Sequence, residues 1–421
     1  MSTTQLMPMA LKALTRDAWL LFVTRFARLF AYGSLSVILV FYLLGLGLTE
    51  VQTGLVLTLT LAGDVVVSLL LTTRADRIGR RRMLVIGAVL MAAAGLAFAS
   101  TRNLFFLILA GTIGVISPSG NEVGPFLSIE QAALTHIVPA TARTEIFAWY
   151  TLAGSLATAL GALSGGFVTQ ALQRTSLSTV ASYRAVVLVY AALGILLAFL
   201  FTRLSALVEV GAVPEGTVPA ASVATVFGIT RSRNVVLKLS SLFALDSFAG
   251  GFVVQSFAAY WFYLRFGVAP ATLGAIFFWA NVFAGISALV ATRLAARIGL
   301  VRTMVFTHLP SNILLILVPL MPNLWLAVLV LLLRFSISQM DVPARQSYTM
   351  AVVPAAERSA AGGFTGVART TGAAISPLFV GFLFAKPSLI NAPFFLAGTL
   401  KISYDLLLYY SFRTLRPPEE R

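Results

Sequence analysis

Ionisable side chains lie inside long apolar stretches of this sequence, where they could bind a solute or carry a proton. They are Arg28, Asp64, Glu122, Glu130, Asp246, Arg334, Asp341, Arg345 and Arg369. A charge in a hydrocarbon environment is costly, so it is normally paired or functional. A buried carboxyl group can take up and release a proton, and an arginine binds carboxylates or phosphates through parallel hydrogen bonds. The set therefore predicts a pathway for a solute, for protons or for both.

Four polar residues between positions 334 and 345 have helical spacing. The spacing is i, i+4, i+7 and i+11, which places all four on one face of a regular helix. The four are Arg334, Ser338, Asp341 and Arg345. We expect this stripe to face protein or water, with both arginines available to a solute. The alternative is an Asp341–Arg345 ion pair that only neutralises itself.

Arg369 lies deeper in its apolar stretch than an arginine normally does. It follows Glu357 by about 18 Å if the intervening chain is helical. At that depth the side chain cannot easily reach an interface, so it needs a carboxylate, water or an anionic ligand. Asp246, in another apolar stretch, could be a proton carrier or the partner of such an arginine.

The first half of the chain offers one arginine and three acids. Glu122 and Glu130 are eight residues apart, which would place them on one face of a regular helix, although the prolines between 117 and 131 should loosen that helix. Asp64 could face a cavity or make a local contact with Ser or Thr. Arg28 would line a cavity and attract negative charge.

Other ionisable residues suit structural roles. Arg25 is close enough to an interface to extend its charged end into it. Lys401 and Asp405 are four residues apart and could neutralise each other. His136 and His308 lie near predicted interfaces and form no recognisable metal-ligand cluster.

The composition excludes a soluble protein. Apolar residues make up 58% of the 421 residues, and charged residues make up 11%, against about 25% in soluble proteins. There is no cysteine, so disulfides, thiol nucleophiles and thiolate metal sites are excluded. No Gly-rich phosphate-binding loop or nucleophile triad is recognisable. We expect a protein that is not an enzyme, with no cofactor and no bound metal.

Apolar segments long enough to cross a bilayer recur along the chain. A helix needs roughly 20 apolar residues to span the hydrocarbon core. The predicted spans are 20–48, 51–72, 83–101, 104–136, 145–170, 183–202, 236–264, 270–292, 303–321, 324–349, 358–384 and 389–411. The chain is therefore predicted to be an all-α membrane protein with twelve transmembrane helices.

A polar break divides these spans into two sets of six. Residues 203–235 contain two prolines and several charges, and no span of adequate length. We predict an N-terminal six-helix bundle at 1–202, a cytoplasmic linker at 203–235 and a C-terminal six-helix bundle at 236–421.

The distribution of Lys and Arg predicts the orientation. Loops on the predicted outer side hold only Arg102, Arg174, Arg184, Arg265 and Lys386, whereas the cytoplasmic segments hold most of the remainder. This bias places both termini in the cytoplasm. It also explains the net charge of +15 through contact with anionic lipid headgroups, without a nucleic-acid partner. The excess of Arg over Lys favours a bacterial source, and hence a multi-pass protein of the inner membrane.

The two halves contain matching segments. Arg77-Ile78-Gly79 matches Arg297-Ile298-Gly299 at a shift of 220, and Val138-Pro139-Ala140 matches Val353-Pro354-Ala355 at a shift of 215. Both pairs lie in predicted cytoplasmic loops at corresponding places in the halves. Two related six-helix units imply a pseudo-twofold axis along the membrane normal, with a binding site between the halves.

One of these loops resembles a known family signature. Asp76-Arg77-Ile78-Gly79-Arg80-Arg81 is similar to the D-R-x-G-R-R loop of the major facilitator superfamily, and the twelve spans and repeat extend the resemblance along the chain. Thr72 replaces the family's usual glycine, and Ala296 replaces the acid in the second copy. The resemblance implies two bundles that rock about a central cavity, as in a secondary transporter. It also implies that Asp76, Arg77, Gly79 and Arg80 gate the cytoplasmic side.

Three classes of function remain open. The first is proton-coupled efflux of a drug or metabolite by alternating access, chosen mainly because efflux is common in the family. The second is uptake or exchange of an organic anion through an arginine-lined cavity. The third is a receptor without transport, or a lipid-handling protein. The expected partners are a small-molecule substrate, protons and the lipid bilayer, and we expect a monomer.

Overall fold

The computed structural model describes residues 14–122, 124–139, 143–209, 232–354 and 357–415. Within these ranges the regular structure is helical, with no strand. The first half contains α2 (Arg16–Gly45), α3 (Glu50–Ile78), α4 (Arg80–Ser100), α5 (Leu104–Ile113), α6 (Phe126–Ile137), α7 (Arg143–Gln173), α8 (Thr179–Thr202) and the short η3 (Ala206–Val208). The second half contains α9 (Arg233–Gly251), α10 (Gln255–Phe266), α11 (Pro270–Ile298), α12 (Leu300–Leu317), η4 (Val318–Leu320), α13 (Leu324–Phe335), α14 (Asp341–Ala351), α15 (Arg358–Phe384), η6 (Pro387–Leu389) and α16 (Ala392–Phe412).

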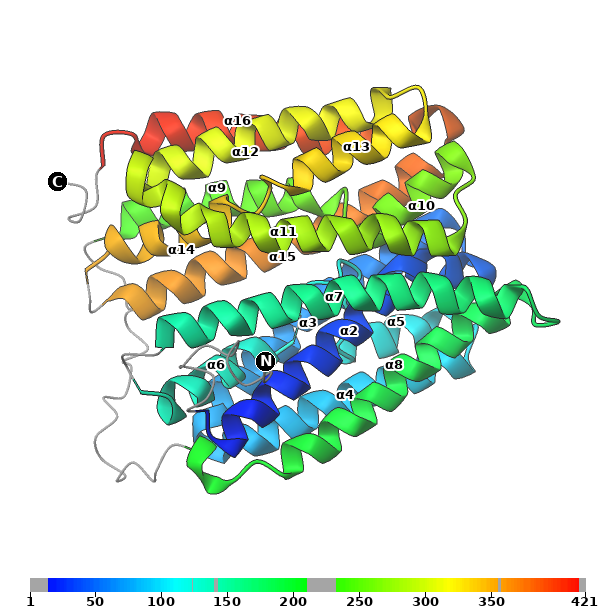
Figure 1. Cartoon of the computed structure of the whole chain (residues 1–421), viewed down its shortest axis with the longest axis horizontal. Coiled ribbons are helices and arrows are strands. Elements are labelled where there is room, and N and C mark those ends of the chain that lie inside the picture. Colours follow the sequence, from blue (N-terminus) through cyan, green and yellow to red (C-terminus); the bar gives the residue numbers. More distant parts are fainter. Residues whose placement is uncertain (1–13, 123, 140–142, 210–231, 355–356, 416–421) are drawn as a thin grey trace, which may run out of the picture. The chain divides into compact units, whose positions relative to one another are not determined.

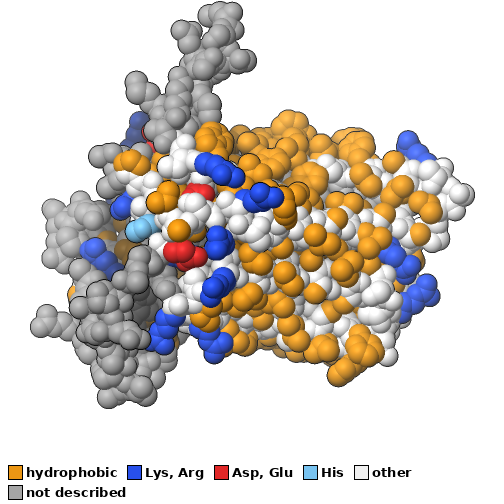
Figure 2. Space-filling view, turned by 90° about the horizontal axis from the view of Figure 1, so that it is seen from below, with side chains coloured by type: hydrophobic (Ala, Val, Ile, Leu, Met, Phe, Trp, Pro, Cys, Tyr) orange, Lys and Arg blue, Asp and Glu red, His pale blue; other side chains and the backbone are white. Residues whose placement is uncertain are grey.

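Many of these helices are suited to a bilayer. In the described part of the chain, nine helical segments are long and apolar enough to cross a membrane, and α5 and α13 are shorter apolar helices. On the face drawn in Figure 2, apolar side chains form a broad band, with Lys and Arg gathered at its two ends. The prediction of an all-α membrane protein is confirmed. The number twelve and the side of the termini remain predictions.

Contacts divide the chain into two compact units. Unit 1 comprises Met1–Leu46, Gly63–Val213 and Pro270–Phe278, and unit 2 comprises Gly47–Ala62, Pro214–Ala269 and Trp279–Arg421. In unit 1, α2 packs on α7 and α8, and α4 packs on α8. In unit 2, α12 packs on α16, and α9 packs on α15 and α16 (Figure 1). The predicted bundle boundaries remain a prediction, and residues 210–231 of the predicted linker lie outside the described residues.

Two predicted spans are interrupted in the structure. The segment predicted as one span at 104–136 forms α5 and α6, and the described residues between them, 114–122 and 124–125, are irregular, as its prolines predicted. The span predicted at 324–349 forms α13 and α14, and residues 336–340 make turns rather than helix. The single helical face predicted for residues 334–345 is therefore wrong. Irregular backbone within a membrane occurs where it is buried or lines a cavity, so both breaks mark functional candidates.

Single-cysteine labelling tests the predicted orientation. Because the native chain has no cysteine, Ser2→Cys and Arg421→Cys each introduce a unique thiol. We expect a membrane-impermeant maleimide to label either thiol only after the membrane has been permeabilised, so that the reagent reaches the cytoplasmic side. Arg174→Cys, in a predicted outer loop, is the matched control and should be labelled in intact cells. Labelling of either terminal cysteine in intact cells would overturn the twelve-span topology.

Candidate functional site

Arg28 forms the centre of a buried ion-pair cluster in unit 1. The side chains of Arg28, on α2, and Glu130, on α6, are fully buried. Two parallel hydrogen bonds of 2.7 Å join the guanidinium nitrogens of Arg28 to the two carboxylate oxygens of Glu130. The Tyr150 hydroxyl donates a further hydrogen bond of 2.5 Å to Glu130. This bidentate geometry satisfies both partners and holds α2 to α6.

Glu122 extends the same cluster from the irregular segment between α5 and α6. One oxygen of Glu122 lies 2.8 Å from Nη1 of Arg25 and 3.3 Å from Nη2 of Arg28. Arg25 is 5% exposed and its guanidinium stacks on the Tyr150 ring at 4.3 Å. The expectation that Arg25 extends to an interface is therefore wrong. Two arginines and two acids neutralise each other in this cluster, which suits a structural role.

Asp64 is the predicted acid of unit 1 that stands apart from this cluster. It lies in the middle of α3 and is 7% exposed. Its neighbours are the Ser68 hydroxyl at 3.4 Å and the backbone N–H of Gly124. Among the described residues no Lys, Arg or His lies within ion-pair distance of Asp64. A buried carboxyl group without a cation is costly to ionise, so Asp64 is suited to carrying a proton.

The loop signature forms the turn between α3 and α4. Gly79 has φ +115°, and Gly299 at the matching place between α11 and α12 has φ +88°. Glycine adopts this conformation without the steric cost of a Cβ atom, which explains why both copies keep it. Arg77 is exposed, and the Asp76 side chain lies outside the described part of the chain.

Glu209 caps the helix that follows this turn. Its carboxylate accepts hydrogen bonds from the backbone N–H groups of Arg80 at 2.7 Å and Arg81 at 3.2 Å. The Arg80 guanidinium donates to the carbonyls of Ala132 and Val208, each at 3.3 Å. These contacts lie within unit 1. The gating role of Asp76, Arg77, Gly79 and Arg80 stays a prediction.

We expect Glu209→Ala to lower the free energy of unfolding by about 1 kcal/mol, because a carboxylate at a helix N-terminus satisfies backbone donors and favours the helix dipole. Thermal unfolding of the purified protein measures the effect. Glu145→Ala, at an exposed position on α7, is the control and should leave the midpoint unchanged. Equal midpoints for Glu209→Ala and the wild type would show that the cap contributes nothing.

Asp246 is the centre of a second buried cluster, in unit 2. It lies on α9 and is 5% exposed. Lys401 Nζ lies 2.5 Å from Oδ1, and Arg345 Nη1 lies 3.1 Å from Oδ2. Arg345 also lies 3.2 Å from Asp341, so the local pair expected from the sequence is present but is shared with another helix. Asp246 is thus a structural partner of an arginine and a lysine.

His308 joins this cluster to Asp405. His308 Nδ1 lies 2.8 Å from Asp405 Oδ1, and Nε2 lies 3.7 Å from Asp246 Oδ1. Asn312 donates to Asp405 Oδ2 at 2.8 Å. The expectation that Lys401 and Asp405 neutralise each other is therefore wrong, because each binds a different helix. His308 is 5% exposed within the bundle, and its expected place near an interface remains a prediction.

Arg334 and Arg369 have no acid partner in the described part of the chain. No carboxylate there lies within ion-pair distance of either guanidinium, and their Nε atoms are buried without a hydrogen-bond partner. Arg369 lies within electrostatic range of Asp246, Asp341 and Arg345, and Arg334 lies within range of Asp246. The described residues of unit 2 therefore include two unpaired arginines beside a neutralised cluster. This arrangement is suited to binding an anion.

The same cluster contains three metal-ligating side chains, a grouping that the sequence did not reveal. Ligand atoms of Asp246, His308 and Asp341 lie within 4.8 Å of one another. Lys401 and Arg345 already bind these carboxylates, so a metal ion would have to displace two cations. The donor set suits charge neutralisation, and we assign no metal site.

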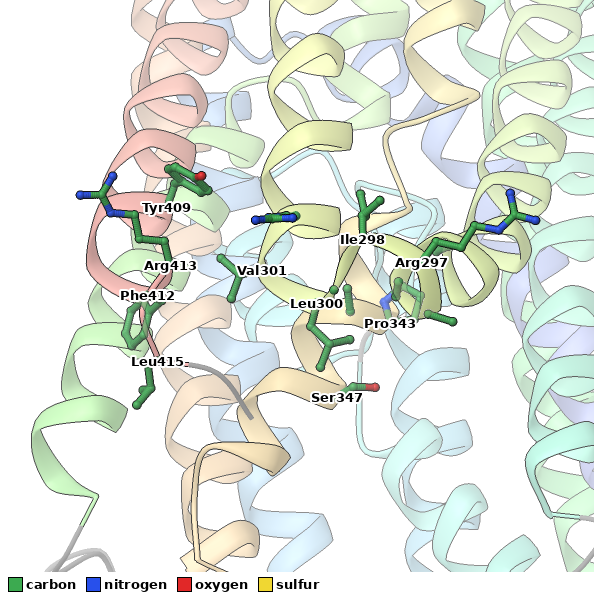
Figure 3. A pocket seen from close by; sticks show the side chains of 16 residues that line it. Arg297, Ile298, Leu300, Val301, Pro343, Ser347, Tyr409, Phe412, Arg413 and Leu415 are labelled. Atoms are coloured by element: carbon green, nitrogen blue, oxygen red, sulfur yellow. The ribbon is translucent and has the colours of Figure 1, made fainter. Parts of the chain in front are cut away.

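A cavity of about 640 Å³ lies elsewhere in unit 2, at the turn between α11 and α12. Figure 3 shows Ile298, Leu300 and Val301 around it, with Phe412 at the end of α16 and Leu415 beyond it. Predicted site residues are absent from the described residues that line it. The unpaired arginines and this cavity are therefore separate features.

Comparisons with known proteins find matches that cover nearly the whole chain. A family model described as the Major Facilitator Superfamily matches residues 21–265 and 246–421. An uncharacterized membrane protein of Saccharomyces cerevisiae is 33% identical over 427 residues, covering 95% of each chain. Among solved structures, a bacterial homologue of the human lysosomal transporter Spinster is 14% identical with a TM-score of 0.68, covering 94% of each chain. A mutant of the nucleoside transporter NupG is 12% identical with a TM-score of 0.76, covering 94% of this chain and all of its own. At such identities the solved structures show the fold alone.

Proposed function

The chain belongs to the major facilitator superfamily, and from this premise we propose that it is a proton-coupled secondary transporter whose solute is a small organic anion. As a family member it is a multi-pass membrane transporter of a small molecule. The anion, the proton and alternating access of the site to the two sides of the membrane are our proposal. So is the bacterial inner membrane as its location.

Arg334 and Arg369 carry the proposal. Every other described residue of the predicted solute and proton pathway, except Asp64, has a partner of opposite charge on the same or another helix. Two arginines without such a partner leave positive charge uncompensated at membrane depth, where charge is costly. A carboxylate or phosphate on the solute would supply the missing charge and accept the parallel donors of each guanidinium. This favours the organic anion over the drug efflux that family frequency suggests.

A thermal-shift screen of the purified protein tests the class of solute. The panel contains lactate, succinate, glycerol 3-phosphate, glycine betaine and tetraphenylphosphonium. A ligand that binds only the folded protein stabilises it by about 2.7 kcal/mol at one hundred times its Kd. We expect the anions to raise the unfolding midpoint and the cation to leave it unchanged. Stabilisation by the cation alone would overturn the proposal.

Asp64 favours a second candidate, exchange of protons for an organic cation. A buried acid without a cation partner can bind either a proton or a cationic group, but not both at once. In this case tetraphenylphosphonium should stabilise the wild type, and Asp64→Asn should remove that effect. The same screen therefore separates the two candidates.

If the solute is an anion, we expect Asp64→Asn to abolish its accumulation against a gradient. The asparagine matches the size of the acid but cannot take up a proton, so the driving force is lost while the anion site is kept. Uptake into proteoliposomes with and without a pH gradient measures coupling, and counterflow at equal pH measures the site. Thr73→Ala, at an exposed position of the same helix, is the matched control and should retain coupling. Gradient-driven accumulation by Asp64→Asn would exclude Asp64 as the proton carrier.

A further inference from the structure

The contact between His308 and Asp405 requires a proton between its two atoms. Nδ1 and Oδ1 lie 2.8 Å apart in the interior of unit 2, where Asp405 is fully buried. A bare imidazole nitrogen and a bare carboxylate oxygen are both acceptors and would repel at this distance. The proton is therefore on the histidine or on the carboxyl group. Because the acid and the imidazole are in direct contact, they bind protons as a pair.

The second nitrogen of His308 faces another acid. Nε2 lies 3.7 Å from Asp246 Oδ1, and an N–H at this position is attracted to the carboxylate, whereas a bare nitrogen is repelled. Asn312 Nδ2 lies 3.1 Å from Nδ1 and also donates to Asp405. Asn312 can donate to Nδ1 only when Nδ1 is bare, in which case the shared proton is on Asp405 and the second proton is on Nε2. If Nδ1 holds the shared proton, Asn312 donates to Asp405 alone. Loss of one proton leaves a bare nitrogen facing Asp246 or Asp405.

Charged and titratable groups from several helices form this pair, contact it or are linked to it through Asp246. They are Asp246 on α9, Arg334 on α13, Asp341 and Arg345 on α14, Arg369 on α15, and Lys401, Tyr404 and Asp405 on α16. Asp246 is the link, because it contacts His308, Lys401 and Arg345 together. A proton gained or lost at His308 changes by one unit the charge that Asp246 meets.

We propose that the His308–Asp405 pair is a proton-binding site that sets the anion affinity of Arg334 and Arg369. This rests on the proposed function for its ligand. When the pair holds its proton, His308 shares Asp246 Oδ1 with Lys401 and offsets part of the negative charge of Asp246. More of the positive charge of Lys401 and Arg345 is then uncompensated, and Arg345 lies within electrostatic range of Arg369. When the proton leaves, Asp246 binds Arg345 and Lys401 more tightly, and less positive charge remains for the solute. Proton uptake and anion binding therefore favour each other.

Nuclear magnetic resonance tests the proton site without any solute. The chain has two histidines, so selective ¹⁵N-histidine labelling gives signals from His308 and His136 only. His136→Asn assigns them, and His136 itself is exposed and serves as the internal control. Spectra are recorded between pH 5 and 9, with the exposed His136 as the reference in the same sample. The His308 nitrogens should report a shared or second proton, which Asp405→Asn should remove.

A singly protonated His308 that follows the same titration as His136 would overturn the proton site. If Asp405→Asn fails to fold, the wild-type titration alone decides. Coupling to the anion is measured by repeating the titration with succinate and with glycerol 3-phosphate. We expect a bound anion to raise the proton affinity of His308 about fivefold or more, the lower end of typical couplings between sites.

If these anions bind and the proton affinity of His308 does not change, the proposal that this pair sets the anion affinity is overturned. If neither anion binds and only the organic cation does, the proposed anion transport fails. The titration without solute still supports or overturns the proton site. The two proposals can therefore fail separately.

Discussion

Arg28→Ala is expected to destabilise the protein strongly and to lower the yield of folded material. The change leaves the fully buried Glu130 without the two hydrogen bonds that neutralise it. Removing one partner of a buried pair costs about 3–5 kcal/mol in soluble proteins, because the other charge stays uncompensated. Thermal unfolding and the yield of folded protein in detergent measure the loss.

Two further variants separate lost charge from lost packing. Arg174→Ala removes an exposed arginine of the same unit and should leave the unfolding midpoint unchanged. Arg28→Met combined with Glu130→Gln removes both charges and keeps the volume, so it should recover most of the stability. An Arg28→Ala protein as stable as the wild type would mean that the cluster does not hold α2 to α6.

Arg369→Ala is expected to reduce transport strongly while leaving folding close to normal. No acid of the described chain pairs with Arg369, so its removal leaves no buried charge behind. If it binds the anion, truncating it costs about 2–5 kcal/mol, which is roughly 30-fold or more in affinity. Arg369→Lys keeps the charge but loses the planar pair of donors, so its transport rate should lie between those of the wild type and Arg369→Ala.

Initial rates of anion uptake in proteoliposomes, with the thermal midpoint of each variant, measure this effect. Arg293→Ala, an exposed arginine of unit 2, is the matched control and should transport normally. A strong loss of stability in Arg369→Ala would point to a structural role. Wild-type uptake with wild-type stability would mean that Arg369 neither binds the solute nor supports the fold.

The fold could be predicted largely from the sequence because a bilayer imposes simple length and polarity rules. Apolar segments of sufficient length, the loop signature and the repeat were enough to identify the family. The breaks were harder. Pro118 and Pro125 predicted the irregular segment between α5 and α6. Residues 336–340 contain no proline or glycine, so nothing in the sequence indicated that the helix is interrupted there. Periodicity assumes a continuous helix, so it gave a false face for Arg334 and Asp341.

The candidate site was predictable as a set of residues but not as a set of pairs. Arg28, Glu122 and Glu130 meet as ion partners although 94 and 102 residues separate them, and spacing along one helix cannot reveal such contacts. The same limit explains the error at Lys401 and Asp405, whose four-residue spacing suggested a pair within α16. His308 was missed because a lone histidine has no sequence pattern. Its partners are on other helices.

The distance along the chain between Arg28 and its acids has a consequence for biogenesis. When α2 leaves the ribosome, Arg25 and Arg28 have no partner, and an arginine costs about 2.5–3.5 kcal/mol at the centre of a bilayer on insertion scales. Glu122 and Glu130 follow 94 and 102 residues later. At about 5–20 residues per second that interval lasts roughly 5–20 s. We therefore expect α2 to stay beside the translocon, or bound to an insertase, until α6 has been synthesised. The two helices can then enter the lipid bilayer together, with their charges paired.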